Sequence, residues 1–153
     1  MSFETSSISP HKYLAFCSKI HKTFKYEKER LFFLGARTFS GAALGVVSAI
    51  NERSGLGGQV GLILINGLNQ FILTAAEKIN TEGYINAHFT FGNLPDDNRF
   101  FMMGGIAVQF GADFTARGLM FGDEKAVATG VILSLIGLTA MTYGEILMDR
   151  RAT

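Results

Sequence analysis

Residues 94–122, LPDDNRFFMMGGIAVQFGADFTARGLMFG, decide how the rest of the sequence is interpreted. The stretch begins with a Pro-Asp-Asp-Asn turn at 95–98, whose side chains can cap a helix that follows. About twenty mostly apolar residues come next, which is roughly the length of a helix that crosses a bilayer. Asp113 and Arg117 are four residues apart, so they can meet on one face of that helix. The sequence predicts a membrane helix with Asp113 and Arg117 as a buried ion pair.

Glycine recurs at every seventh position in this stretch and again in the segment after it. The positions are Gly104, Gly111, Gly118, Gly130, Gly137 and Gly144. In water each glycine would cost a helix about 1 kcal/mol relative to alanine, but in lipid small residues let two helix backbones approach closely. We therefore expect the last two segments to dock on each other. The alternative is a water-soluble protein with a glycine-rich buried helix, or with a loop and two strands.

The composition favours a single membrane domain. Apolar residues make up 48% of the 153 residues and charged residues only 18%, which is below the roughly 25% usual in soluble domains. The net charge of +1 gives no sign of a nucleic-acid-binding protein. Cys17 is the single cysteine, so the chain has no internal disulfide, and we expect no reactive role for Cys17.

Four apolar segments predict an all-α, four-helix integral membrane bundle over residues 31–150. The expected spans are approximately 31–50, 57–76, 100–121 and 126–148. Gly41 and Gly45 in the first span, and Gly57 and Gly61 in the second, have the small-xxx-small spacing of closely packed membrane helices. All four are expected at helix contacts, together with the six glycines of the later spans.

Several polar residues fall inside the predicted spans. Asn66, Asn69 and Gln70 are expensive in lipid unless they face other helices or water. We expect them to form hydrogen bonds between helices, and a polar lining of a channel is the alternative. Arg37 is expected to extend its side chain to the lipid headgroups.

Residues 1–30 are predicted to form a polar, basic arm. Residues 10–30 contain six Lys/Arg, with Leu14, Phe16 or Cys17, Ile20 and Phe24 at helical spacing, as in an amphipathic helix. Such a helix could lie on a membrane surface or in the groove of a partner. The arm lacks the features of a secretory signal or of a typical mitochondrial presequence. A solvated arm that becomes ordered on a partner is equally compatible with the sequence.

The distribution of cations supports four crossings. With an even number of spans, the arm, the 77–99 connection and the C-terminus share one side of the membrane and carry ten Lys/Arg, whereas Arg53 and Lys125 alone lie in the loops on the other side. Inserted helical proteins show this kind of asymmetry.

No catalytic, cofactor-binding or metal-binding motif is present in the sequence. We expect no enzyme activity and no cofactor, and the one ligand we envisage is a phospholipid such as cardiolipin. Asp113 with Glu145 could serve as a proton relay, but a structural Asp113–Arg117 pair is the simpler interpretation. We expect other membrane subunits and lipids as partners, and neither nucleic acid nor a small-molecule substrate.

The second half of the chain is similar to a known family. Pro95-Asp96-Asp97, Phe100-Phe101, Gly104-Gly105, Ala116-Arg117 and the glycine-spaced last segment resemble the mitochondrial inner-membrane translocase family. Within that family the chain most resembles the branch of respiratory complex I (NADH:ubiquinone oxidoreductase) accessory subunits. The resemblance covers residues 94–145 best and 35–147 more loosely.

The resemblance implies a location and a role. It implies four tilted helices in the mitochondrial inner membrane, with both termini toward the intermembrane space. The complex I branch implies a non-catalytic subunit that supports assembly and stability, whereas the translocase branch implies a channel subunit with a groove for polypeptides. A small viral or bacterial membrane protein that assembles with itself is a third alternative.

Overall fold

The chain folds into four α-helices and contains no strand among its described residues. The computed structural model describes residues 10–51, 55–82 and 96–152, and it describes side chains for 28–51, 55–80 and 97–148. The helices are α1 (Pro10–Ile50), α2 (Gly55–Glu82), α3 (Asp96–Phe121) and α4 (Glu124–Ala152). The predicted all-α, four-helix class is therefore confirmed.

Local residue chemistry explains where the helices begin and end. Pro10 is the first residue of α1, a position where its missing N–H leaves no helical hydrogen bond unmade. Gly122, with φ 71°, adopts the left-handed conformation that ends α3. The Asp123 carboxylate then accepts hydrogen bonds from the backbone N–H groups of Lys125 (3.0 Å) and Ala126 (3.1 Å), and so caps α4. The predicted cap at 95–98 lies partly outside the described residues.

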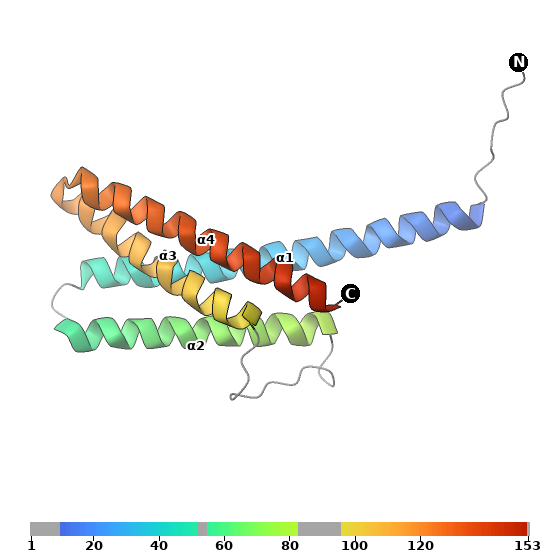
Figure 1. Cartoon of the computed structure of the whole chain (residues 1–153), viewed down its shortest axis with the longest axis horizontal. Helices are drawn as coiled ribbons and strands as arrows, with labels where there is room; N and C mark the ends of the chain where they lie inside the picture. Colours follow the sequence, from blue (N-terminus) through green and yellow to red (C-terminus); the bar gives the residue numbers. More distant parts are fainter. Residues whose placement is uncertain (1–9, 52–54, 83–95, 153) are drawn as a thin grey trace, which may run out of the picture.

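The helices run antiparallel to one another in chain order (Figure 1). α1 and α2 lie side by side, and the α3–α4 pair crosses them obliquely, with α3 in contact with all three other helices. α1 continues without interruption through residue 30, so residues 10–30 of the predicted arm and the first span form one helix. Its N-terminal part projects beyond the ends of the other helices (Figure 1).

Glycines bring α3 and α4 into backbone contact. A Cβ atom added to Gly111 would lie 2.6 Å from the carbonyl oxygen of Gly130, and one added to Gly137 would lie 2.6 Å from that of Gly104. Gly118 and Gly144 complete the seam, where added Cβ atoms would meet backbone atoms of the facing helix or its cap. The two glycine series, each with a period of seven residues, therefore pack against each other along the antiparallel pair of α3 and α4.

The first glycine pair packs α1 against α3. A Cβ atom on Gly41 would lie 2.8 Å from the carbonyl oxygen of Gly105, and one on Gly45 would lie 2.9 Å from the backbone nitrogen of Asp113. Gly57 and Gly61 were expected at a similar contact, but an added Cβ atom at either would meet no described atom within 4 Å. This part of the prediction is wrong for the isolated chain, because α2 packs through its opposite face.

The polarity of the fold is reversed relative to a water-soluble protein. Among the described side chains, 25 large hydrophobic ones are exposed, whereas ten polar or charged residues and only six hydrophobic ones are buried. The apolar core is small and centres on Phe101, Val108 and Met141. Exposed apolar surface of this extent marks contacts with a membrane or with other proteins, which agrees with the membrane character that the sequence predicts.

Three helices contain segments long and apolar enough to cross a membrane: Lys28–Ile50, Gly55–Asn80 and Glu124–Met148. The predicted fourth span, 100–121, is helical but is not among them. The reason is that α3 contains Gln109, Asp113, Arg117 and four glycines. α3 is packed against all three other helices, so Gln109 is buried by protein, whereas Asp113 and Arg117 remain partly exposed.

Candidate functional site

A polar stripe on α2 faces the interior of the bundle. Its members follow one another at intervals of seven, four, four and three residues, which places them on one face of a helix. They are Gln59, Asn66, Gln70, Thr74 and Glu77. The last four are fully buried, whereas the opposite face of α2 carries exposed Leu64, Leu68 and Ile72. α2 is therefore attached to the bundle mainly through polar groups.

Two amides form the centre of the stripe. Asn66 Nδ2 donates to the carbonyl oxygen of Gly105 (2.9 Å) and to Gln109 Oε1 (3.0 Å) on α3. Gln70 Nε2 lies 3.1 Å from Asn66 Oδ1 and 3.1 Å from the carbonyl oxygen of Arg37 on α1. A Cβ atom on Gly105 would lie 2.5 Å from Gln70 Nε2, so the glycine makes room for the amide. These bonds join α1, α2 and α3.

Arg37 connects α1 to two other helices. Its Nη1 donates to Glu145 Oε1 on α4 at 2.8 Å, and its Nη2 donates to Glu77 Oε2 on α2. The guanidinium carbon lies 3.9 Å from the ring centroid of Phe101 on α3, in a cation–π contact. The side chains of Arg37 and Glu77 are 0% exposed and that of Glu145 is 5% exposed. One side chain therefore contacts all three other helices.

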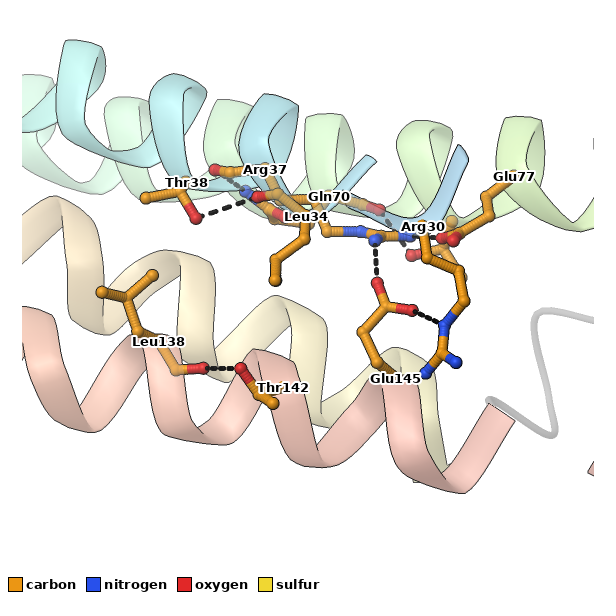
Figure 2. Close-up of polar contacts among 10 residues, drawn as sticks. Arg30, Leu34, Arg37, Thr38, Gln70, Glu77, Leu138, Thr142 and Glu145 are labelled. Carbon is orange, nitrogen blue, oxygen red and sulfur yellow. Dashed lines mark hydrogen bonds and ion pairs between the residues drawn. The ribbon is translucent and has the colours of Figure 1, made fainter. Parts of the chain in front are cut away.

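Arg30 completes this charge cluster toward the surface. Its Nε donates to Glu145 Oε2 at 3.3 Å, and its side chain is 22% exposed (Figure 2). Two arginines thus face two glutamates, so the cluster is formally neutral. We call Arg30, Arg37, Glu77 and Glu145 the charge clamp. A neutral, hydrogen-bonded cluster is the arrangement in which ionised groups are tolerated at membrane depth.

A second polar group lies toward the opposite end of the bundle. Arg117 Nε donates to Asp113 Oδ1 at 3.0 Å, and Arg117 Nη2 lies 3.4 Å from the carbonyl oxygen of Ser48 on α1. The predicted pair therefore forms, but it is not buried as expected, because the side chains are 32% and 13% exposed. Nearby, Ser48 Oγ donates to Gln59 Oε1 at 2.6 Å.

The structure brings some predicted polar residues together and separates others. Asn66 and Gln70 lie at the α1–α2–α3 contact. Asn69 is only half-buried, because each helical residue turns 100° from the last and Asn69 falls about a quarter turn from the stripe. Glu145 pairs with Arg30 and Arg37 on α1, not with Asp113.

The charge clamp was missed by sequence reasoning. Arg37 was expected to reach the headgroups, but its guanidinium is fully buried. A signal was available, since Arg37 lies in the first half of its span while Glu77 and Glu145 lie near the ends of theirs. Antiparallel neighbours place those three positions at similar depth, where opposite charges can compensate one another.

Comparisons of the chain with protein-family models, curated proteins and solved structures find no match. Among the described residues, no group of three or more His, Cys, Asp or Glu side chains could hold a metal ion. The carboxylates and guanidinium groups of the charge clamp are bonded to one another. The role that this arrangement supports directly is therefore to hold helices together.

Proposed function

We propose that this chain is a non-catalytic accessory subunit that stabilises a large membrane complex by helix packing. The observation that carries this proposal is the charge clamp, in which Arg37 ties α2 and α4 to α1 with fully buried ion pairs. The interior polar groups hold the bundle together, and the exposed apolar side chains leave all four helices available to neighbouring subunits or lipid.

The resemblance of residues 94–145 to the complex I accessory branch supports a more specific proposal. The complex would be respiratory complex I, and the location would be the mitochondrial inner membrane. The glycine seam between α3 and α4 falls within the residues that carry this resemblance.

A translocase channel is less well supported. That function needs Asn66, Asn69, Gln70 and Asp113 on one open polar face. Asn66 and Gln70 instead donate hydrogen bonds to backbone carbonyls of α3 and α1, and Asp113 pairs with Arg117. The polar groups of α2 therefore serve helix contacts.

The proposal is tested by blue-native electrophoresis of mildly solubilised membranes that contain the full-length chain with a C-terminal tag. Mass spectrometry then identifies the proteins that comigrate with the tag. An unrelated tagged inner-membrane protein serves as the control for nonspecific comigration.

We expect the tag in a large band that contains NADH-oxidising activity and complex I core subunits. A smaller band with translocase components would contradict the accessory role and support the channel function. A band that contains only this chain would point to self-assembly, and recovery in the soluble fraction would contradict membrane integration altogether.

A further inference from the structure

The N-terminal part of α1 stands outside the bundle. α1 has 41 residues, of which 18 precede the candidate span that begins at Lys28. At 1.5 Å per residue these 18 residues add about 27 Å of helix. Figure 1 shows this part extending past the ends of α2, α3 and α4. We call residues 10–27 the stalk.

No Pro or Gly interrupts α1 between the stalk and the start of the candidate span. A helix that emerges from the bilayer can lie on its surface only after a sharp bend, and sharp bends occur at Pro, Gly or similar interruptions. Residues 22–34 contain neither Pro nor Gly, and α1 is a single uninterrupted helix across them. Where the segment Lys28–Ile50 crosses a bilayer, the stalk therefore continues in the direction of the span and not along the membrane surface.

The sequence of the stalk is basic and amphipathic. Residues 10–26 contain four lysines and two histidines but no Asp or Glu. The helical period puts Tyr13, Cys17, Ile20 and Phe24 on one side and places Lys19 and Lys22 away from that side. An unsupported helix of this length is marginal in water.

We propose that the stalk is a docking helix for an acidic protein surface outside the membrane, on a neighbouring subunit. The occupant must offer an apolar groove for the side that contains Ile20 and Phe24, with carboxylates along its border for the lysines. Helix-in-groove recognition uses this spacing of apolar anchors, and bordering charges add specificity and speed of association. The proposal rests on the proposed accessory role and adds the chemistry of the partner.

The first test places the stalk relative to the bilayer. The full chain, labelled with bimane at its native Cys17, is reconstituted in vesicles of phosphatidylcholine and phosphatidylglycerol. We expect quenching by aqueous iodide and little quenching by brominated lipids. Leu68→Cys in a Cys17→Ser background is the control, because Leu68 is an exposed residue within the second span. Strong quenching of the Cys17 label by brominated lipids would overturn the proposal in favour of a surface-lying helix.

The second test measures the partner contact in native membranes. We expect Lys22→Glu to lower the share of chain in the large assembly roughly fivefold, and added salt to weaken the wild-type assembly. Lys125→Glu makes the same charge change at the start of α4 and should leave assembly unchanged. We also expect Cys17 to react with maleimide more slowly in the assembled pool than in the free pool.

The outcomes separate this proposal from the accessory role. A normal large assembly with Lys22→Glu, or equal Cys17 reactivity in both pools, would overturn the docking role while leaving the accessory function intact. Absence of any large assembly for the wild-type chain would overturn the accessory function itself.

Discussion

Arg37 is the residue on which the interior of this bundle depends most. Its guanidinium contacts Glu77, Glu145 and Phe101, which belong to three different helices. Removing one partner of a buried ion pair leaves the other charge without compensation, and this is far more costly than losing an exposed pair. The energetic importance of Arg37 therefore follows from the two buried carboxylates to which it donates hydrogen bonds.

Replacing Arg37 by Leu should lower the free energy of unfolding by about 3–5 kcal/mol. The matched control is Arg117→Leu, which breaks a partly exposed pair and should cost about 1 kcal/mol or less. Both values can be measured by SDS titration in mixed micelles with circular dichroism. Adding Glu77→Gln and Glu145→Gln to Arg37→Leu should restore part of the loss. Equal effects of the two arginine substitutions would contradict the assigned role of Arg37.

The wide separation of the clamp residues in the sequence explains why the charge clamp was hard to predict. The sequence contains Arg37, Glu77 and Glu145 at separations of 40 and 108 residues, and no local pattern connects them. Arg37 alone fits the pattern of a residue that extends toward the headgroups. Its partners become evident only when the antiparallel order of the helices is known, since that order sets which residues share a depth.

At the scale of elements, the α3–α4 seam is the most predictable contact in the molecule. Two glycine series with the same period allow close backbone approach along an antiparallel pair. The structure has this approach at Gly104 with Gly137 and at Gly111 with Gly130. The seam needs glycine because an added Cβ atom would meet a backbone carbonyl, which cannot move aside as a flexible side chain can.

Gly111→Leu should separate α3 from α4 and lower the free energy of unfolding by about 3 kcal/mol or more. The matched control is Gly61→Leu, because a Cβ atom at Gly61 meets no described atom within 4 Å. The control should be neutral or more stable by up to about 1 kcal/mol, as leucine is the better helix former. Thermal unfolding of both variants in detergent tests the difference. Similar stability of the two variants would show that the seam is not a tight interface.

The orientation of α2 shows where sequence reasoning at this scale fails. The Gly57–Gly61 motif predicted a contact, but these glycines lie on the side of α2 opposite to Asn66 and Gln70. A small-residue motif shows that close packing is allowed, whereas buried polar groups require hydrogen-bond partners. The polar stripe therefore determines which face of α2 turns inward.

At the scale of the whole molecule, the fold buries polar groups and exposes apolar ones. Composition and apolar segments were sufficient to predict an all-α protein of four helices, but α3, which was predicted as a span, is not among the three candidate spans. The continuity of α1 from Pro10 differs from the prediction, because residues 1–30 lack the apolarity of a span and the sequence therefore predicts a separate arm. We expect the exposed apolar side chains to meet lipid, and this expectation can be tested on the isolated chain.

The measurement that tests this most directly is spin-label accessibility in reconstituted vesicles, with single cysteines in a Cys17→Ser background. Labels at Leu68 on α2 and Leu135 on α4 report the exposed apolar surface, and a label at Val108 on α3 reports the core. A label at Lys125, which is exposed in the first turn of α4, provides the aqueous reference.

We expect oxygen, which concentrates in lipid, to relax the labels at Leu68 and Leu135 much more strongly than a water-soluble nickel chelate does. Both reagents should reach Val108 poorly. If the nickel chelate instead reached Leu68 and Leu135 as readily as Lys125, these faces would meet water, and the membrane bundle described here would be contradicted.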